Sequence, residues 1–387
     1  MKIVIAPDSF KESLTAMQVA DAVEAGFKII FPDAQYIKLP MADGGEGTVV
    51  SMIEATQGTL KEVTVTAPLG NKVTAFYGLS GDGKTAVIEM AAASGLHLVP
   101  AAKRDPRITT TFGTGELILA ALDDGAEKII LGIGGSATND GGAGMMQALG
   151  AVFRDTQGYS LSFGGSALAS LASVDMRELD PRLSLTEFVV ACDVNNPLCG
   201  PKGASATFGP QKGATPAVVT ELDVALHHYG EIIESLTGKS VIDVAGAGAA
   251  GGMGVPLMAW LDAKMQPGIE MVIETLDLHR VVQGADLVIT GEGRMDSQTI
   301  HGKTPVGVAR VAKACGIPVI ALVGGMSDDY ACVHDHGIDA VFSVVRGISS
   351  QEDALAQAAQ NVEVTARNVA ATLAIKISPS YFRMPGC

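Results

Sequence analysis

The chain begins Met1-Lys-Ile-Val-Ile-Ala-Pro-Asp-Ser9, a short apolar run that ends in a proline, an acid and a hydroxyl side chain. Such a run, rich in Ile and Val and bounded by a turn signal, predicts a buried strand over residues 3–6. Residues 16–30 then predict a helix, and residues 36–39 predict a second strand that is followed by another helix. Two βα units in succession indicate a parallel sheet with helices on both faces.

The last third of the chain resumes this alternation, with strands expected at residues 286–290, 318–323 and 340–345 and helices around 305–314 and 352–375. Residues 63–66, 73–77 and 86–89 instead alternate in polarity between short Gly-rich turns, which favours antiparallel pairing. We predict an α/β protein with a flavodoxin-like doubly wound domain (residues 1–60 plus 263–387). A second α/β domain containing antiparallel strands (residues 61–262) is inserted into it. The active site is expected in the cleft between the two domains.

Composition narrows the classes of function. The formal net charge of −15 argues against nucleic acid or an anionic membrane as a partner. Five cysteines without a Cys-x-x-Cys pair suit reduced thiols in a cytoplasmic protein. The first residues reach Pro7 too soon for a signal peptide, and no apolar stretch is long enough to cross a membrane. The sequence leaves a homo-oligomer open.

Two stretches match well-known nucleotide-binding patterns in the wrong context. Residues 78–85 fit GxxxxGK[ST], but a strand is expected after Lys84 where a P-loop needs a helix, so we predict a hairpin turn. Residues 246–251 fit GxGxxG after strand-like residues 241–245, yet residues 267–283 read as helix where a dinucleotide-binding unit needs a second strand. This second loop either binds an anion or allows close packing of helices.

The strongest local signal is Gly132-Ile-Gly-Gly-Ser-Ala-Thr-Asn-Asp-Gly-Gly142, between an expected strand at residues 128–133 and a helix at 143–149. Successive glycines leave backbone N–H groups free to form a concave anion site, and a helix N-terminus adds positive potential. Backbone amides would let an acidic protein hold an anion without many lysines. We therefore predict phosphate binding by this loop.

Acidic and small polar residues follow several other expected strands. They are Asp8, Ser9 and Lys11 after the first strand, Asp43 and Glu46 after the second, Asp193, Asn195 and Asn196 after residues 187–192, and Glu292, Arg294 and Asp296 after residues 286–290. Ligands gather at the carboxyl ends of parallel strands, so these side chains should converge. Hydroxyls, carboxylates, cations and amides together form the inventory that phosphoryl transfer needs.

These loops closely resemble those of the bacterial type-I glycerate kinases (glycerate 2-kinase, enteric type). The matching segments are residues 6–13, 42–48, 81–90, 132–142, 191–197, 208–213 and 290–299. The resemblance covers the chain to about residue 375, and only residues 378–387 have no counterpart. It implies ATP- and Mg²⁺-dependent phosphorylation of D-glycerate to 2-phosphoglycerate. The alternatives are a kinase for another small hydroxy acid, a kinase that forms 3-phosphoglycerate, and a non-catalytic sensor of glycerate or nucleotide.

We infer an expected role for each candidate residue. Asp193 orients or deprotonates the glycerate hydroxyl, while Lys11 or Arg294 binds the glycerate carboxylate. Asp43 and Asp296 are the candidates for Mg²⁺. The further substrate-binding candidates are Asp8, Ser9, Asn195 and Glu292. The candidates for nucleotide or phosphate binding are Gly134, Gly135, Ser136, Thr138, Asn139, Gly141 and Lys212.

Overall fold

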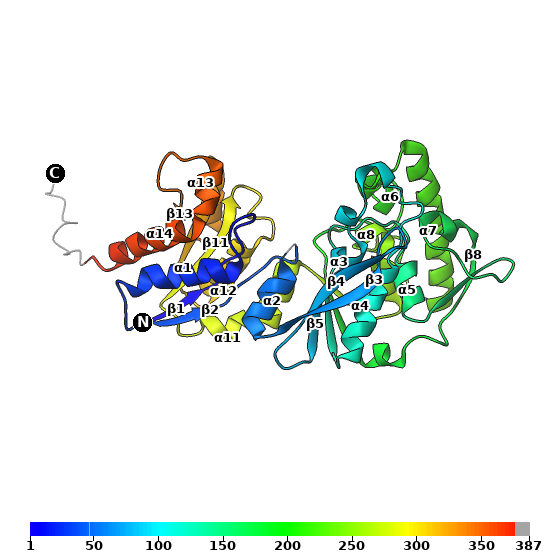
Figure 1. The fold of residues 1–387 in the computed structure, drawn as a ribbon, viewed down its shortest axis with the longest axis horizontal. Helices are drawn as coiled ribbons and strands as arrows, with labels where there is room; N and C mark the ends of the chain where they lie inside the picture. Colours follow the sequence, from blue (N-terminus) through cyan, green and yellow to red (C-terminus); the bar gives the residue numbers. More distant parts are fainter. Residues whose placement is uncertain (46, 376–387) are drawn as a thin grey trace. The chain divides into compact units, whose positions relative to one another are not determined.

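The computed structural model describes residues 1–45 and 47–375, which form two compact units (Figure 1). The first unit comprises Met1–Asp43 and the described residues from Ile273 on, and the second is Gly44–Val272. The chain therefore leaves the first unit once and returns to it. Glu46 and the tail at residues 378–387 lie outside the described residues.

The first unit is built on a five-stranded parallel sheet. Its strand order is β13 (Ala340–Ser343), β12 (Val319–Met326), β11 (Leu287–Met295), β1 (Lys2–Ile5) and β2 (Gln35–Lys38). Numbered along this unit alone, the strands follow the order 2-1-3-4-5 of flavodoxin-like sheets, which confirms the predicted fold class. The helices are α1 (Ala16–Lys28), α11 (Leu278–Val282), α12 (Thr304–Ala314), α13 (Gln351–Ala356) and α14 (Ala358–Leu373), with a 3₁₀ turn at Tyr330–His336.

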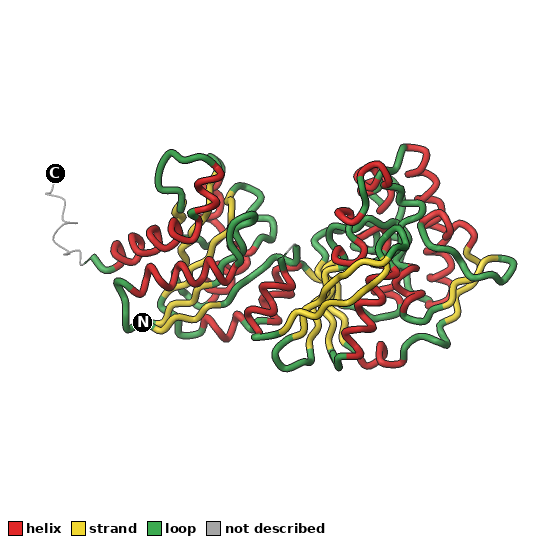
Figure 2. Tube along the Cα trace, viewed as in Figure 1, coloured by secondary structure: helices red, strands yellow, loops and turns green. Residues whose placement is uncertain are grey.

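Helices cover this sheet because alternate strand residues point to opposite faces. Ile3 and Ile5 pack in one core with Val23 of α1 and Val362 of α14, while α12 contacts β11 and β12. Helices α1 and α14 lie against each other (Figure 2). Gly26 permits this approach, since a Cβ built there would lie 2.3 Å from the carbonyl oxygen of Glu363.

The second unit is built on a mixed six-stranded sheet. Its strand order is β10 (Lys264–Gln266), β9 (Glu187–Ala191), β6 (Lys128–Gly132), β5 (Thr85–Glu89), β4 (Lys72–Leu79) and β3 (Thr59–Thr66). Strands β10, β9, β6 and β5 are parallel, whereas β5, β4 and β3 pair antiparallel. The antiparallel part agrees with the alternation seen in the sequence. A separate hairpin pairs β7 (Val152–Asp155) with β8 (Leu171–Asp175).

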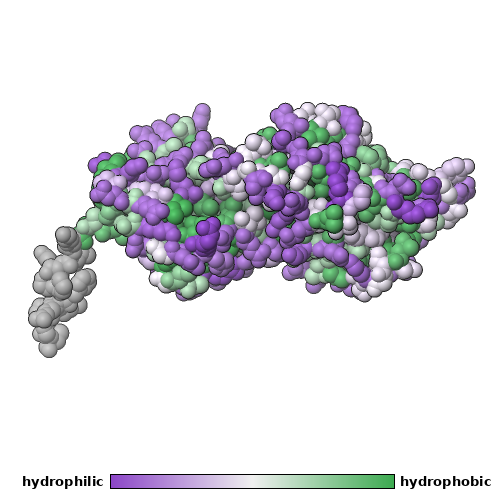
Figure 3. Space-filling model, turned by 90° about the horizontal axis from the view of Figure 1, so that it is seen from below, coloured by the Kyte–Doolittle hydropathy of each residue, from purple (hydrophilic) through white to green (hydrophobic). Residues whose placement is uncertain are grey.

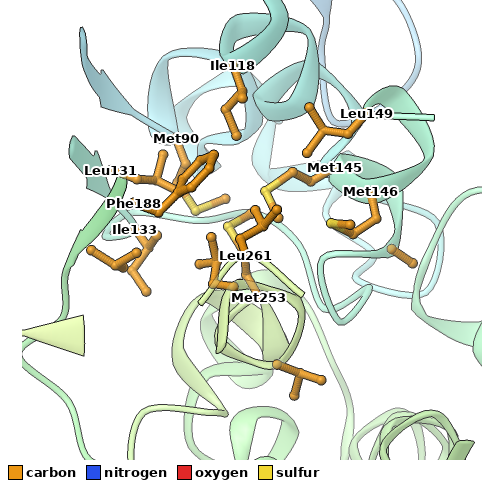
Figure 4. Packing of buried hydrophobic residues seen from close by; sticks show 14 of the residues in the cluster. Met90, Ile118, Leu131, Ile133, Met145, Met146, Leu149, Phe188, Met253 and Leu261 are labelled. Carbon is orange, nitrogen blue, oxygen red and sulfur yellow. The ribbon is translucent and has the colours of Figure 1, made fainter. Parts of the chain in front are cut away.

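Short helices surround this sheet together with one long helix. They are α2 (Thr48–Thr56), α3 (Ala91–Ser94), α4 (Phe112–Asp123), α5 (Ala143–Ala148), α6 (Ala204–Phe208), α7 (Pro216–Thr237), α8 (Ala249–Gly252), α9 (Gly254–Ala259) and α10 (Gly268–Thr275). Further 3₁₀ turns span Leu96–Leu98, Ala101–Lys103, Gly165–Ser170, Pro181–Leu185 and Pro210–Lys212. Methionines and aliphatic side chains from several of these elements fill one core, as Figure 4 shows for Met90, Met145 and Met253. This core holds the ends of β5 and β6 in place.

The domain boundaries expected near residues 60 and 263 remain a prediction. In the structure α2 and β10, which flank those limits, are part of the second unit. Helix α2 packs on β4 and β5, and β10 pairs with β9. No local sequence pattern assigns either element to the second unit, because the strands that they contact lie elsewhere in the chain.

Two local expectations are wrong. Residues 267–283 do not form one helix, because Asp277 adopts a left-handed conformation (φ +50°) between α10 and α11. Residues 241–245 do not form a strand, because the amides of Val241 and Ile242 donate to the carboxylate of Glu234 at 2.7 and 3.1 Å. A side chain supplied the hydrogen bonds that a neighbouring strand would otherwise provide.

Polar and apolar residues are interspersed over the face seen in Figure 3. Some large apolar side chains are exposed singly, among them Leu185 and Ile348. Scattered apolar residues are normal on a protein surface. Within residues 1–45 and 47–375, no helix combines the length and the apolar character that crossing a bilayer requires.

The contact between α1 and α14 generates a stability prediction. We expect Gly26→Ala to lower the free energy of unfolding by about 1–3 kcal/mol, because the added methyl group meets backbone atoms that cannot move alone. Gly347→Ala is the control, since a Cβ at that exposed position meets no atom within 4 Å. Urea denaturation of both variants measures the difference. Equal stabilities would contradict the close approach of the two helices.

Candidate functional site

The second unit contains a cavity of about 230 Å³ at the carboxyl ends of β6 and β9. The lining residues are Gly44, Gly45, Ile133, Gly134, Gly135, Ser136, Ala191, Cys192, Asp193, Val194, Phe208, Gln211, Lys212, Ala249 and Ala250. The lining therefore combines part of the glycine-rich loop with apolar side chains and a few polar ones. This is the usual composition of a site for a small molecule.

The loop that follows β6 presents its backbone to this cavity. A Cβ built on Gly134 would meet no atom within 4 Å, so its backbone borders open space. Gly135 has a φ of +71°, a left-handed conformation that glycine adopts without strain. The Ser136 hydroxyl completes this polar edge of the cavity. An anion placed here would meet backbone and hydroxyl groups before it met any carboxylate of the same loop.

Lys212 supplies the positive charge of the cavity. It ends the 3₁₀ turn Pro210–Lys212, and its ammonium donates to Ser136 Oγ at 2.8 Å and to the carbonyl oxygen of Thr138 at 2.7 Å. The side chain is only 2% exposed. Burial lowers the pKa of Lys212 from 10.5 to about 7, although the negative charge of Asp140 opposes this shift. An ammonium with so low a pKa readily changes its charge when an anion binds.

The N-terminus of α5 differs from the prediction. It was expected to face the anion, but the amides of Gly142 and Gly144 donate to the Asp140 carboxylate at 3.2 and 3.3 Å. The amide and hydroxyl of Thr111 donate to the same carboxylate at 2.8 and 2.9 Å. The carboxyl group of Asp140 thus occupies this helix end. Gly141 is needed for close packing, because a Cβ there would lie 2.6 Å from the Tyr229 ring.

The predicted phosphate-binding residues therefore fall into two groups. Gly134, Gly135, Ser136 and Lys212 line the cavity, whereas Thr138, Asn139 and Gly141 do not. The Thr138 and Asn139 side chains are completely buried, and the Asn139 amide nitrogen donates to Ser205 Oγ at 3.0 Å. These residues support the loop from behind.

Asp193 brings a carboxylate to the cavity wall. It follows β9 at the carboxyl end of the sheet, is exposed, and accepts a hydrogen bond from the amide of Gly268 at 3.0 Å. Asn195 is exposed in the same loop but does not line the cavity. Asp193 is thus a fixed carboxylate that a ligand can reach.

A second polar cluster lies in the first unit, at the carboxyl ends of β1 and β11. These two strands are neighbours although they are far apart in sequence, and the strand order reverses between them. Doubly wound sheets bind ligands at such a reversal. Asp8 accepts hydrogen bonds there from the Ser9 amide at 2.6 Å and from the Thr304 hydroxyl at 2.7 Å. Glu292 accepts one from the Thr299 hydroxyl at 2.6 Å.

The carboxylates of this cluster affect each other's ionisation. Burial raises the pKa of Asp8 to about 6, and the negative charge of Asp43 contributes in the same direction. Burial likewise raises the pKa of Glu292 to about 7, and the charge of Asp8 adds to it. Hydrogen bonds from Thr304 and Thr299 oppose these shifts. Acids with raised pKa at a strand-order reversal are typical of functional sites.

One lysine lies beside two acids of this cluster. Lys303 Nζ lies 3.6 Å from Glu292 Oε2 and 3.7 Å from Asp296 Oδ1. Asp296 also accepts a hydrogen bond from the Gln298 amide at 2.9 Å, which holds the local turn. Lys11 and Arg294 are exposed, and neither forms an ion pair with an acidic side chain in the part of the chain that the structure describes. Both remain available to an anionic ligand.

The acidic side chains described above can be compared with the ligands that Mg²⁺ requires. Among the described residues no group of three or more His, Cys, Asp and Glu side chains converges on one point. Mg²⁺ in phosphoryl-transfer enzymes is commonly held by one or two carboxylates, with water and substrate phosphates as the other ligands. Asp8 and Asp43, close enough to influence each other's charge, fit that requirement. Asp296 faces Lys303 instead, so it is the weaker partner for Asp43.

The two pattern matches have structural explanations. Residues 78–85 join the antiparallel strands β4 and β5 through a turn, as predicted, and Lys84 pairs with Glu127 at 3.2 Å on the surface. In the other match, a Cβ on Gly248 or Gly251 would lie 2.1 Å from a carbonyl oxygen of a neighbouring segment. These two glycines allow close packing, while Ala249 and Ala250 between them line the cavity.

The sequence reading missed several residues of these clusters. Asp140 was inside the glycine-rich motif but received no role, and its partner Thr111 precedes a distant helix. Thr299 and Thr304 stand beside the predicted acids. The threonine before Pro305, at the start of a helix, is a local signal that could have placed a hydroxyl near the strand ends. Phe208 and Gln211 lie in the matching segment 208–213 but received no role from the sequence.

Comparison with known proteins agrees with this geometry. The model of the glycerate kinase family matches residues 3–374. The chain is similar to the glycerate kinase of Haemophilus influenzae (61% identical, covering 97% of this chain and 100% of the relative). It is also similar to the glycerate 2-kinase of Escherichia coli (60%, covering 97% and 98%). A crystal structure of a proposed glycerate kinase 2 from Salmonella typhimurium superposes with a TM-score of 0.90 at 60% identity, covering 96% of this chain and 98% of that one.

Lys212 should give the stability of the protein a measurable pH dependence. Its pKa is about 7 in the folded chain and 10.5 ordinarily, so the unfolded chain binds more protons between these two values. Stability attributable to Lys212 therefore rises with pH in that window. We expect the unfolding free energy of the wild type, minus that of Lys212→Met, to rise by up to about 1.4 kcal/mol per unit between about pH 7 and 9. A flat difference in urea denaturation would contradict the lowered pKa.

Proposed function

Because the chain belongs to the glycerate kinase family, we propose that it transfers the γ-phosphoryl group of ATP to the C2 hydroxyl of D-glycerate, forming 2-phosphoglycerate. The observation that carries the proposal is identity of about 60% to glycerate kinases over almost the whole chain, including a glycerate 2-kinase. The polar cavity and the carboxylate cluster supply the chemical groups that such a reaction uses.

The cavity of the second unit is suited to the phosphates. Phosphoryl transfer relies on positioning and on stabilisation of negative charge rather than on covalent chemistry by the protein. Lys212 and the Ser136 hydroxyl meet at 2.8 Å beside the backbone of Gly134 and Gly135. These donors would hold phosphate oxygens in a protein whose overall charge repels them.

The cluster of the first unit is suited to glycerate and Mg²⁺. Arg294 or Lys11 binds the glycerate carboxylate, since both are exposed without an acidic partner in the described chain. Ser9 and Glu292 are the further candidates of this unit for binding the substrate hydroxyls, and Asn195 is the candidate of the second unit. Asp8 and Asp43 would hold Mg²⁺, with Asp296 as the other candidate. When bound, the cation neutralises charge on the transferred phosphoryl group.

Asp193 is assigned to the glycerate hydroxyl. A carboxylate can orient an attacking hydroxyl and accept its proton as the bond to phosphorus forms. Asp193 is held by the Gly268 amide at 3.0 Å, and its exposure leaves the carboxylate accessible to substrate. The cavity that it lines is also the one that contains Lys212.

An assay of ADP release over a panel of hydroxy acids tests the proposed activity. With ATP and Mg²⁺ present, we expect turnover with D-glycerate and little with tartronate or sugar acids. Phosphorus NMR of the product should show 2-phosphoglycerate. A signal for 3-phosphoglycerate would correct the position of transfer. Binding of glycerate without any turnover would identify a sensor and refute the proposal.

We expect Asp193→Asn to reduce kcat by roughly 100- to 10,000-fold, as loss of a general base does. The KM for ATP should change by less than about threefold, because nucleotide contacts remain. The control is Asp33→Asn, which changes an exposed aspartate that precedes β2. An effect confined to the KM for ATP would show that Asp193 serves nucleotide binding instead.

A further inference from the structure

Phe208 is a large aromatic side chain that the second unit does not use for its core. It ends α6, is half-buried, and lines the cavity that contains Lys212. In the described chain it belongs neither to the core cluster shown in part in Figure 4 nor to the side chains packed against that cluster. No aromatic ring within residues 1–45 and 47–375 stacks on it. The ring is therefore available to a ligand in the cavity.

Gln211 brings an amide to the same cavity. It is exposed, lines the cavity, and lies one position before Lys212. Its side-chain amide forms no hydrogen bond with any residue that the structure describes. A primary amide offers two N–H donors and a carbonyl acceptor. Gln211 can therefore bind a ligand that presents a donor and an acceptor side by side.

The segment that carries these two side chains is anchored to the glycine-rich loop before and after them. Ser205 Oγ accepts a hydrogen bond from the Asn139 amide nitrogen at 3.0 Å, and Lys212 Nζ donates to Ser136 Oγ at 2.8 Å. All four of these residues are buried. The aromatic ring and the amide thus lie at a set distance from the loop that is proposed to hold phosphates. Such preorganisation lowers the entropy cost of binding.

The backbone at Ala250 is a separate sign of a ligand site. Ala250 lines the cavity and has a φ of +53°, a left-handed conformation that strains any residue with a side chain. Gly251 and Gly252 after it adopt positive φ without strain. Strained residues cluster at ligand sites, where the surrounding structure holds them. The chain thus places a methyl group beside the cavity at a position where glycine would relieve the strain.

We propose that Phe208 and Gln211 form the nucleobase subsite of the second unit. The flat face of a purine stacks on the Phe208 ring, and the Gln211 amide forms hydrogen bonds with the polar edge of the base. Lys212 and Ser136 hold the phosphates of the same nucleotide. The inference rests on the proposed function, which supplies a nucleotide as the ligand. It adds the recognition of the base, which the phosphate donors cannot provide.

A purine suits these groups better than glycerate does. Glycerate is a small polar acid, and its carboxylate and hydroxyls offer no flat apolar surface to an aromatic ring. A purine has two faces that stack on aromatic side chains, and its edge presents hydrogen-bond donors and acceptors side by side. Most of the cavity lining is glycine backbone or apolar side chain. This lining favours a base over a second acid beside Phe208.

Isothermal titration of the full-length chain with ADP, pyrophosphate and D-glycerate tests the subsite. Pyrophosphate carries the phosphates of ADP without the base. We expect Phe208→Ala to weaken ADP binding by about 5- to 150-fold, the range for loss of stacking on one base. Pyrophosphate binding should change by less than about twofold, because Lys212 and Ser136 remain. Phe208→Tyr keeps the ring and should bind ADP within about threefold of the wild type.

Gln211→Ala should weaken ADP binding by about 3- to 10-fold, as loss of a hydrogen bond does. Pyrophosphate binding should again be unchanged. Two control variants remove the same kinds of side chain from the exposed turn after β7. They are Tyr159→Ala and Gln157→Ala, and both should match the wild type with every ligand.

Equal losses of affinity for ADP and pyrophosphate in Phe208→Ala would overturn the proposal, because the ring would then only support the phosphate-binding loop. Unchanged ADP affinity, or a loss confined to D-glycerate, would overturn it as well. If Phe208→Ala does not fold, Phe208→Leu replaces it under the same criteria, since leucine keeps apolar volume but cannot stack.

The two proposals fail in different ways. Turnover of D-glycerate by a chain whose ADP affinity does not depend on Phe208 would refute the nucleobase subsite alone. Binding of ADP that depends on Phe208, without turnover of D-glycerate, would refute only the proposed function.

Discussion

The second unit depends on one buried carboxylate. Asp140 accepts hydrogen bonds from residues that begin two different helices, Thr111 before α4 and Gly142 and Gly144 at α5. It therefore fixes the loop from which Ser136 and the Thr138 carbonyl group hold Lys212. Removing this carboxylate would leave several buried donors without acceptors, a loss that costs far more than one hydrogen bond contributes. The hydrogen bonds of Asp140 thus help to shape the cavity.

This arrangement answers an electrostatic problem. A protein with a formal charge of −15 repels anions at long range, and its surface lysines are largely engaged with acids, as Lys84 and Lys313 are. A single ammonium in a water-poor cavity interacts with an anion more strongly than a solvated lysine does, because less water screens the charge. Burial also brings the pKa of Lys212 to about 7, so its charge responds to the ligand and to Asp140.

The first unit instead gathers acidic side chains at its strand ends. Asp8, Asp43 and Glu292 would repel one another if all were ionised, and this repulsion raises the pKa of Asp8 and Glu292 beyond the effect of burial. A divalent cation would relieve the repulsion, and the Thr304 and Thr299 hydroxyls hold the carboxylates in place without one. The parallel strands β1 and β11 bring these groups together from opposite ends of the sequence.

The sequence by itself determined the α/β class, the antiparallel part of the second sheet and the glycine-rich loop, because each depends on local periodicity or on residues adjacent in the chain. It also separated the hairpin at Lys84 from a true P-loop, since the following strand is a local property. Only the tertiary structure decided that Asp140 fills the end of α5, that Thr111 and Thr304 support distant carboxylates, and that residues 241–245 are not a strand. Thr111 and Thr304 lie 29 and 296 residues from the acids that they support. The partners of Asp140 at α5 and of Glu234 are close in the sequence, but only the packed structure fixes the orientation of those two side chains. A local sequence pattern does not indicate which residues will form such hydrogen bonds.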